Sequence, residues 1–398
     1  MRKILYIVPT LKAGGAEKAA PAHTLNAGPN PLKAGEAHTI FLNSDGTLIA
    51  WGWNEDGQLG DGSKDNRLIP VRVKGLDGKG NLEGITAVAA GALHSVAVKK
   101  DGTAWAWGNN DKGQLGNSST DAQKTPVQVK TDSGKEYLEG IMAIAAGALH
   151  SVAVKKDGTV WAWGYNDDGQ LGDDSYQKRR LSAIQVKGPD GDDELKDIAA
   201  VAAGSAHTLA LNRKHGTVWG WGNNDNGQLG DDSKRGRTTP VQAKGLKGIT
   251  AIAAGAGHSL ALKADGTVWA WGNNDHGQLG DDSSKLRKTP VQVKGLKGII
   301  AIAAGENHSA ALKDDGTVWI WGSNNTGQLG INQAKGAKRL VPTLVEGLSG
   351  VSAIGAGNNH TVAFKNDGTI WVWGGNAKGQ LGISSKDDRM VPIQLNVP

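Results

Sequence analysis

Residues 249–280 read ITAIAAGAGHSLALKADGTVWAWGNNDHGQLG, and this stretch decides the fold. Its pattern recurs seven times in the 398 residues: A-G-x-x-H-[ST], an alternating run, a D-G-T turn (H-G-T in the fourth copy) and W-G-x-N-x-x-G-Q-L-G. The copies begin 50 to 57 residues apart, and their first glycines are Gly35, Gly91, Gly147, Gly204, Gly255, Gly305 and Gly357. A repeat of this length indicates units that bury their apolar surface against one another.

Each copy predicts four β-strands. In the fifth copy, residues 249–255 are rich in alanine and isoleucine, while residues 258–266 and 267–272 alternate with a period of two. Asp-Gly between the alternating runs predicts a hairpin with a type I′ turn. Residues 289–295 (TPVQVKG) contain a proline near their start, which suits an outer edge strand. Four-stranded units repeated without helices predict an all-β fold, a seven-bladed β-propeller of four-stranded antiparallel blades.

Side-chain size places the strands within each blade. Alanine and glycine suit the innermost strand, because seven strands crowd the axis. Tryptophan falls in two columns two residues apart, which share one face of a strand and should pack against the adjacent blade. The first column is Trp105, Trp161, Trp219, Trp269, Trp319 and Trp371, with Ile49 in the seventh place; the second is Trp51, Trp107, Trp163, Trp221, Trp271, Trp321 and Trp373.

The repeats divide the chain into a leader, residues 1–28, and a propeller, residues 29–398. The repeat cores are residues 34–60, 90–116, 146–172, 203–230, 254–280, 304–330 and 356–382. The first blade is irregular, because its innermost strand must come from residues 30–35 (NPLKAG), which lack the alanine-isoleucine pattern.

Charge and composition restrict the function. There is no cysteine, so neither a disulfide framework nor a thiolate metal site is expected. The net charge is +5, of which +3 lies in the leader, so the propeller is nearly neutral and nucleic-acid binding has little support. No apolar run reaches the length of a membrane span, and Pro9 makes the leader a poor signal peptide. We expect a monomer without membrane association, and the cytoplasm is favoured over secretion.

Seven of the ten histidines occupy one position of the repeat: His38, His94, His150, His207, His258, His308 and His360. Equivalent positions in adjacent blades are too far apart for one metal ion with bonds of about 2 Å. We therefore expect each histidine to begin a strand and to bond a neighbouring turn. The loop N-N-D-x-G-Q-L-G-D-D lacks the ligand pattern of calcium loops, so its Asn and Asp side chains should bond local backbone. No metal ion, cofactor, catalytic residue or enzymatic activity is predicted.

Two other kinds of binding stay open. The tryptophan columns could stack on sugars, although the same positions suit the interblade core; Trp53 is the tryptophan expected to be exposed. Basic clusters recur in the same loop, and each lies near an acidic pair, as Lys178-Arg179-Arg180 lies near Asp173-Asp174. Interspersed charges suggest a solvated face, with contact to DNA or chromatin as the alternative.

The unit G-x-x-H-[ST]…D-G-T…W-G-x-N…G-Q-L-G resembles the repeat of the regulator of chromosome condensation family over residues 30–398. The resemblance implies a seven-bladed propeller that works through protein surfaces, although one fold hosts many activities. Members include a nucleotide exchange factor for a small GTPase, a plant UV-B photoreceptor and a bacterial β-lactamase-inhibiting propeller. The near-identical copies look more like bacterial members. The photoreceptor's Trp-Arg pair is absent from all seven copies. No gap between copies exceeds the others by more than seven residues, so the exchange factor's β-wedge is hard to place.

The expected function is therefore that of a non-enzymatic protein-binding propeller, either an interaction scaffold or an inhibitor. Exchange-factor-like regulation of a small GTPase is one alternative, and carbohydrate or chromatin binding is another.

The first 18 residues, MRKILYIVPTLKAGGAEK, carry a second resemblance, to the opening strand, glycine-rich loop and helix start of GT-B glycosyltransferases. In that family the turn corresponding to Gly14-Gly15 approaches a sugar nucleotide near a helix N-terminus. Nothing downstream supplies the alternating strands and helices of that fold. We expect a fusion remnant without transferase activity.

Specificity is expected where the copies differ. The connection from the outer strand to the next inner strand has four residues after copies 4 to 6, but ten after copies 1 to 3, at residues 75–84, 131–140 and 188–197. Three consecutive longer loops should form a raised sector on one side of the disc, acidic towards blade 4. Neutral drift of the loops is the alternative explanation. The predicted partner-binding residues are Asp77, Lys79, Asn81, Asp132, Lys135, Glu136, Tyr137, Asp190, Asp192, Asp193 and Glu194, with Tyr137 as the anchor.

Overall fold

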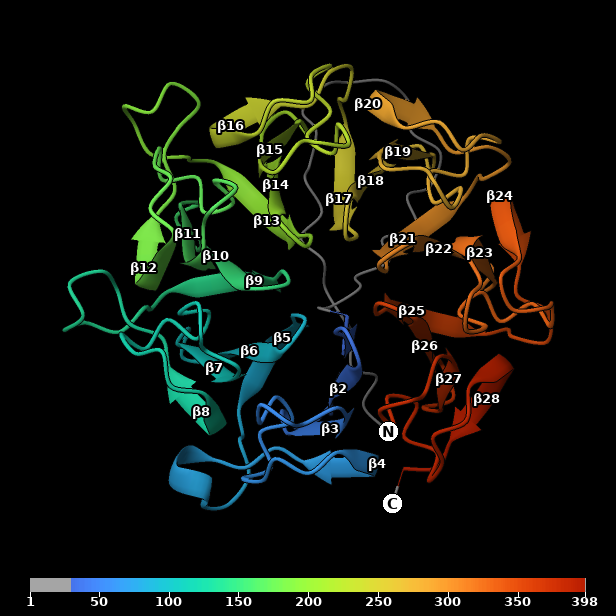
Figure 1. Cartoon of the computed structure of the whole chain (residues 1–398), viewed down its shortest axis with the longest axis horizontal. Coiled ribbons are helices and arrows are strands. Elements are labelled where there is room, and N and C mark those ends of the chain that lie inside the picture. Colours follow the sequence, from blue (N-terminus) through green and yellow to red (C-terminus); the bar gives the residue numbers. More distant parts are fainter. Residues whose placement is uncertain (1–29, 398) are drawn as a thin grey trace, which may run out of the picture.

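Seven four-stranded antiparallel sheets surround a central axis in the computed structural model, which describes residues 30–397 (Figure 1). Each sheet consists of four consecutive strands in chain order from the axis outward, so no strand is exchanged between blades. The predicted seven-bladed propeller is confirmed. The only helical element in the described part is the 3-10 turn η1 (Leu76–Gly78), and no helix there could span a bilayer. Residues 1–18, which resemble a glycosyltransferase start, lie outside the described residues.

The strands are as follows, from the axis outward in each blade. Blade 1 has β1 (Leu32–Ala34), β2 (His38–Leu42), β3 (Leu48–Gly52) and β4 (Arg67–Arg72); blade 2 has β5 (Ile85–Ala90), β6 (His94–Lys99), β7 (Ala104–Gly108) and β8 (Gln123–Gln128); blade 3 has β9 (Ile141–Ala146), β10 (His150–Lys155), β11 (Val160–Tyr165) and β12 (Arg179–Gln185); blade 4 has β13 (Ile198–Ala203), β14 (His207–Asn212), β15 (Val218–Gly222) and β16 (Arg237–Gln242); blade 5 has β17 (Ile249–Ala254), β18 (His258–Lys263), β19 (Val268–Gly272) and β20 (Arg287–Gln292); blade 6 has β21 (Ile299–Ala304), β22 (His308–Lys313), β23 (Val318–Ser323) and β24 (Lys338–Leu344); blade 7 has β25 (Val351–Ala356), β26 (His360–Lys365), β27 (Ile370–Gly374) and β28 (Arg389–Leu395).

The turn between the second and third strands differs from the predicted type I′ turn. In blade 5 the Lys263 amide donates to the Thr267 carbonyl and the Gly266 amide donates to the Lys263 carbonyl, each at 2.9 Å. Gly266 has a positive φ of 75°, but Asp265 does not, which excludes the type I′ turn. Asp265 instead accepts hydrogen bonds from the backbone and hydroxyl of Thr267. The Asp-Gly-Thr sequence therefore builds a longer hairpin loop with glycine at its left-handed position.

A fully buried hydrogen-bonded unit joins each blade to the next. Between blades 4 and 5, the hydroxyl of Ser259 and the indole Nε1 of Trp271 both donate to the backbone carbonyl of Gln228. Because the hydroxyl hydrogen is used in this way, the Nε2–H of His207 donates to Ser259 Oγ. The same three bonds, each 2.7–3.1 Å long, occur at all seven interfaces. The repeated His, Ser/Thr, Trp and Gln positions thus hold the ring together.

The ring closes between blades 7 and 1 with the same unit. Thr39 and Trp51 of blade 1 donate to the Gln380 carbonyl of blade 7, and Thr39 Oγ1 lies 3.0 Å from His360 Nε2. Strand β1 lies within residues 30–35, where the sequence predicts the innermost strand of blade 1. The Asn30 side chain donates a hydrogen bond to the Ile354 carbonyl of β25. Closure therefore depends on side chains rather than on a shared strand.

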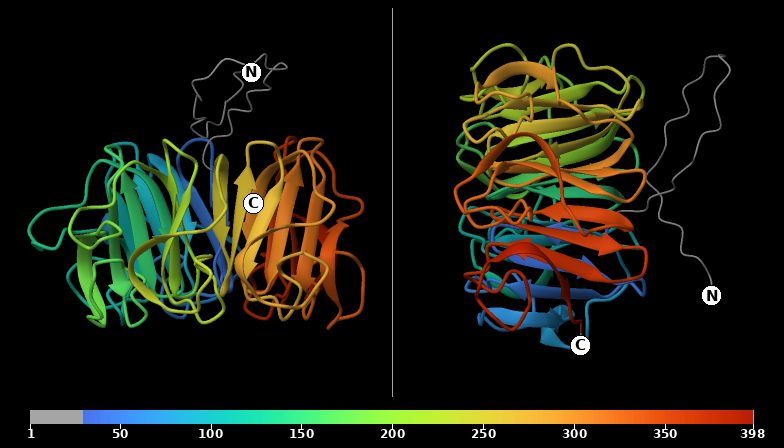
Figure 2. Two further views of the ribbon diagram at one scale, coloured as in Figure 1. Left: turned by 90° about the horizontal axis from the view of Figure 1, so that it is seen from above. Right: turned by 90° about the vertical axis from the view of Figure 1, so that its right-hand side faces the viewer.

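The disc has two faces, between which the strands run (Figure 2). We call one the His face, because it carries the Gly-x-x-His loops and the long loops after the third strands; the Asn273 amide there donates to the Gly257 carbonyl. We call the other the hairpin face. It carries the Asp-Gly hairpins and the connections between blades, since the Ile299 amide donates to the Gly266 carbonyl. The Asp-Gly hairpins and the connections between blades therefore share this face.

Candidate functional site

The connections after blades 1 to 3 contain extra hairpins. Every connection between blades, short or long, buries one leucine: Leu82, Leu138 and Leu195 in the long ones and Leu246, Leu296 and Leu348 in the short ones. In the long connections this leucine amide also bonds the outer strand, as Leu82 does at Val73. In each long connection the six additional residues precede the leucine and form a hairpin. Its two ends are joined by the antiparallel bridges Lys74–Asn81, Lys130–Tyr137 and Lys187–Glu194, respectively.

All eleven side chains predicted to bind a partner are exposed and belong to these hairpins. We call residues 75–81, 131–137 and 188–194 the insertion sector. It projects outward from the rim over consecutive blades, on the left of Figure 1, rather than rising above one face as predicted. Tyr137 is 49% exposed, and Leu76, which the sequence analysis missed, is 55% exposed. The first long connection contains two leucines, Leu76 and Leu82, whereas each short connection contains one. This second leucine was the feature of the sequence that could have identified Leu76 as exposed.

The insertion sector also contacts the outer strand of the following blade. Element η1 packs against β8, Thr131 forms a bridge with Ala183 of β12, and Thr239 of β16 donates to the Pro189 carbonyl. The third hairpin carries four carboxylates, so the sector is acidic towards blade 4 as expected. These contacts fix the backbone of the hairpins against the rim, so the exposed side chains have defined positions.

The seven histidines form His–Ser or His–Thr pairs, which could suggest nucleophilic catalysis. In each pair the hydroxyl hydrogen is committed to the Gln carbonyl and the imidazole donates, which is the opposite of a general base taking a proton. Burial lowers the histidine pKa to about 3 in five blades and to about 4 at His207 and His308. The pairs are fully buried, so they are structural. The histidines begin strands as predicted, but they bond the next blade's Ser or Thr and not a turn.

The long loops on the His face are held by side-chain bonds. In blade 4, Asn224 is fully buried; its Oδ1 accepts from the Leu229 amide and its Nδ2 donates to Asp231. Asp231 also accepts two hydrogen bonds from Arg237, and Arg67, Arg180 and Arg287 make the equivalent ion pairs. Arg180, Arg237 and Arg287 of the basic clusters are therefore part of the loop structure, whereas Lys178 and Arg179 are exposed. No group of three or more metal-binding side chains exists among residues 30–397.

The tryptophan columns pack between blades, as predicted. The second column is entirely buried, and the first is at least partly buried at each blade interface. Trp53 is half-buried rather than exposed, with the Lys378 ammonium 4.8 Å from its ring centre. The second column therefore offers no ring face for stacking on sugars.

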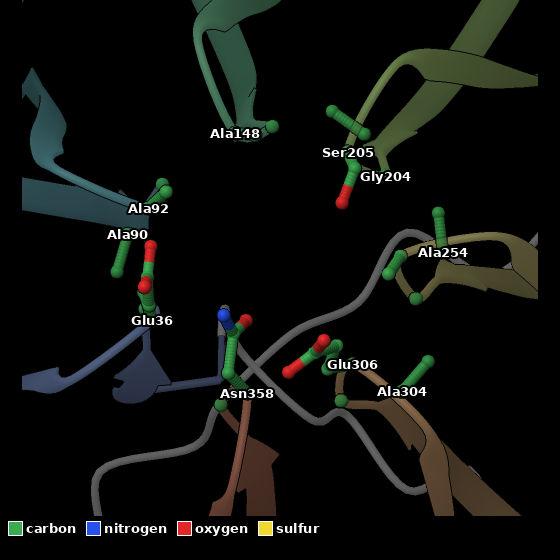
Figure 3. A pocket seen from close by; sticks show the side chains of 18 of the residues that line it. Glu36, Ala90, Ala92, Ala148, Gly204, Ser205, Ala254, Ala304, Glu306 and Asn358 are labelled. Atoms are coloured by element: carbon green, nitrogen blue, oxygen red, sulfur yellow. The ribbon is translucent and has the colours of Figure 1, made fainter. Parts of the chain in front are cut away.

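A hollow of about 170 Å³ lies on the axis at the His face (Figure 3). It is lined by the Ala-Gly-x triplet of every repeat, and mostly by alanine and glycine. Its polar side chains are Glu36, Ser205, Glu306 and Asn358, and Figure 3 shows Asn358 between the two glutamates. Burial, and then the charge of Glu306, raises the pKa of Glu36. This site was not expected from the sequence, although each of its four polar side chains directly follows the first glycine of a repeat.

Comparison with known proteins places these features in a family. A model of the RCC1-like domain matches residues 11–348, and models of the regulator of chromosome condensation (RCC1) repeat match residues 351–380 and 367–398. The ultraviolet-B receptor UVR8 of Arabidopsis thaliana is 32% identical over 375 residues, which are 92% of this chain and 70% of the receptor. The human E3 ubiquitin-protein ligase HERC2 is 32% identical over 235 residues, 58% of this chain but only 5% of that much longer protein.

Solved structures share the fold. Prp20p from Saccharomyces cerevisiae, described with its binding properties to Gsp1p and histones, has a TM-score of 0.73 and 25% identity over 90% of this chain and 87% of its own. Human WBSCR16 has the same TM-score and identity over 89% of this chain and 94% of its own. A family match over most of the chain, with the seven-bladed architecture, shows that the chain belongs to the RCC1-like family of β-propellers.

Proposed function

We propose that this chain is a non-enzymatic protein-binding propeller, a scaffold or an inhibitor, and that the insertion sector is its partner-binding surface. The observation that carries the proposal is the difference between blades. The ring-forming positions are alike in all seven repeats, whereas extra hairpins occur only after blades 1 to 3. Contacts that build the ring explain the repeated residues, so the departures are the places where recognition can differ from one propeller to another.

The chemistry of the insertion sector suits a protein partner. Leu76 and Tyr137 are large apolar side chains about half exposed, and exposed charged side chains of both signs belong to the same hairpins. An apolar or aromatic centre with a polar rim is the usual composition of a protein-binding surface. The support from β8, β12 and β16 pre-orders the hairpins, which reduces the entropy lost on binding.

The test replaces each long connection by a short one, which removes the hairpin and still supplies a leucine for the buried position. Residues 75–84, 131–140 and 188–197 are each replaced by Gly-Leu-Lys-Gly, the connection found after blades 4 and 5. We expect an unchanged strand content and a partner lost from affinity capture in native extract. The matched control, Lys247→Ala with Lys297→Ala in the short connections, should keep the partner. Retention of the same partner by the trimmed protein would place binding elsewhere.

A second candidate function is regulation of a small GTPase by nucleotide exchange, which the family resemblance implies. The likeness to Prp20p supports it, although that likeness is at 25% identity. A nucleotide-release assay with a small GTPase of the same cell separates the two functions. Acceleration of release at catalytic amounts of the propeller favours exchange activity, and stoichiometric binding without faster release favours a scaffold or inhibitor.

A further inference from the structure

The outer strand of each blade lies on the rim of the disc, and the insertion sector covers three of the seven. Its hairpins pack on β8, β12 and β16, the outer strands of blades 2 to 4. The outer strands of blades 6 and 7, β24 and β28, follow short connections and are neighbours on the rim (Figure 1). No hairpin within residues 30–397 packs on these two strands, since the short connections have none. We call β24 and β28 the open rim.

The open rim exposes apolar side chains where the covered strands have small polar ones. At one position of the outer strand, blades 2 to 5 carry a threonine or serine: Thr125, Ser182, Thr239 and Thr289. Blades 6 and 7 have Val341 and Val391 there, which are 37% and 40% exposed, and Leu344 at the end of β24 is 38% exposed. Ile69, at the same position of blade 1, is also exposed. Single exposed apolar residues are common, but a series on consecutive blades marks a surface for another protein.

The open rim also carries two arginines without a carboxylate partner. In blades 1, 3, 4 and 5 an arginine near the start of the outer strand forms an ion pair with an aspartate of the long loop of its own blade. Ile331 and Ile383 replace that aspartate in blades 6 and 7. Arg339 and Arg389, both half-buried, form no ion pair or side-chain hydrogen bond within residues 30–397. Their unused donors suit a carboxylate from outside the chain.

The acidic side chains close to these arginines in the sequence are engaged elsewhere or lie beyond the strands. Asp388 directly precedes Arg389, but its carboxylate lies 2.7 Å from the Lys335 ammonium of blade 6. Asp387 accepts a hydrogen bond from a serine hydroxyl of its own loop. Glu346 follows the end of β24, and neither β24 nor β28 contains an acidic residue. The two strands therefore combine unpaired positive charge with exposed apolar surface, which is complementary to an acidic and partly apolar chain.

The insertion sector shows how a segment of chain can lie on an outer strand. In blade 3, Thr131 forms a parallel bridge with Ala183 of β12, whereas Thr239 of blade 4 contacts its hairpin through its side chain. At the position of Ala183, β24 and β28 have Pro342 and Pro392, which cannot donate a backbone hydrogen bond. A segment on the open rim therefore has to be recognised mainly through side chains, and not as a regular added strand.

We propose that the open rim binds an extended acidic segment of a partner protein. Carboxylates of the segment pair with Arg339 and Arg389, and its apolar side chains cover Val341, Leu344 and Val391. A protein segment fits better than a nucleic acid, because each arginine is followed two residues later by an exposed valine that phosphates would leave uncovered. The open rim is separate from the insertion sector, so it adds a second contact area to the propeller.

The probe is a fluorescein-labelled (Gly-Glu-Val)₄ peptide, titrated with the full chain and followed by fluorescence anisotropy at low and physiological salt. Arg339→Gln with Arg389→Gln removes the two unpaired charges, and we expect about a tenfold loss of affinity. Val341→Thr with Val391→Thr introduces the residue of blades 2, 4 and 5 and should weaken binding about fivefold. The control is Lys234→Gln with Lys285→Gln, which removes the same charge from exposed loop positions of blades 4 and 5 and should change affinity less than about twofold.

Equal affinities of the two glutamine double variants would overturn the proposal, because binding would then follow net charge alone. Absence of binding by the parent chain at low salt would also overturn it, as would equal or tighter binding of the matched (Gly-Lys-Val)₄ peptide or of single-stranded DNA. Unchanged affinity of the threonine double variant would exclude the apolar contact and overturn it as well. Unfolding midpoints identify a variant that does not fold, and the other double variant then decides the question.

Discussion

Replacing one ring histidine, His94→Gln, should destabilise the propeller at pH 7.5 and have almost no effect at pH 5.0. Burial holds the pKa of His94 at about 3, whereas its ordinary value is 6.5. The unfolded chain therefore takes up a proton below pH 6.5 that the folded chain does not. The histidine's contribution is fully present above pH 6.5 and is lost as the pH falls from 6.5 towards 3. At about 1.4 kcal/mol per pH unit, keeping one histidine neutral at pH 5.0 costs about 2 kcal/mol.

The cost of the substitution at pH 7.5 comes from the contact that it removes. His94 Nε2 bonds Ser151 Oγ at 2.8 Å in a site without solvent, so we expect a loss of about 2 kcal/mol. At pH 5.0 the variant escapes the protonation penalty, and the two terms nearly cancel. In the parent chain the pKa of every ring histidine is lowered by burial, so a penalty of this kind applies in all seven blades. The free energy of unfolding of the parent chain should therefore fall steadily as the pH falls from 6.5 to 5.0.

The assay is urea unfolding followed by tryptophan fluorescence at both pH values. His215→Gln, at an exposed position of the blade 4 hairpin, is the control and should change the unfolding free energy by less than about 0.5 kcal/mol at either pH. An equal destabilisation by His94→Gln at pH 7.5 and 5.0 would refute the reasoning, because it would mean that the folded protein binds protons at the ring histidines.

Four further substitutions test other features of the ring, each by denaturant unfolding. Gly255→Ala should cost at least about 3 kcal/mol, because its Cβ would stand 2.4 Å from a carbonyl of the next blade. Gly245→Ala, with φ at +74° but open space around it, should cost about 1 kcal/mol; equal costs would contradict the steric argument. Arg237→Ala removes the ion-pair partner of the Asp231 carboxylate, whose side chain is 3% exposed, and should lower the free energy of unfolding by about 1–2 kcal/mol. An effect as small as that of an exposed ion pair would show that the loop does not depend on Arg237. Lys33→Met should stabilise the protein by about 1 kcal/mol at pH 7, since burial lowers the pKa of Lys33 to about 8 and some solvent contact remains. That gain should shrink as the pH rises from 8 to 10.5, and a gain that persisted above pH 10.5 would exclude the charge as its cause.

The ring could be predicted from the sequence because its determinants are local and repeated. Alternating residues specify strands, alanine marks the crowded axis, and seven copies fix the number of blades. The turn at Asp265 could not be predicted in detail, because Asp-Gly suits several hairpin loops and the choice depends on the preceding residues. The same limit applies to Trp53, whose burial follows from the approach of Lys378 of blade 7 after the ring has closed.

The candidate sites differ in how far the sequence could show them. The insertion sector arises from a difference in loop length between the repeats, so its residues could be identified from the sequence. Its projection from the rim could be seen only in the structure. The hollow combines Glu36 of blade 1 and Glu306 of blade 6, which are far apart in the sequence and come together only when the ring closes. The partner of each histidine was missed for a similar reason, since Ser259 is adjacent to a histidine of its own blade but bonds that of the blade before.

Hydrogen–deuterium exchange of the full chain, with and without the partner obtained by affinity capture, locates the partner-binding surface. We expect slower exchange on binding at residues 75–84, 131–140 and 188–197, with little change in the short connections after blades 4 and 5. Unchanged exchange in all three insertions, with protection confined to other loops, would contradict the assignment of the insertion sector as the partner-binding surface.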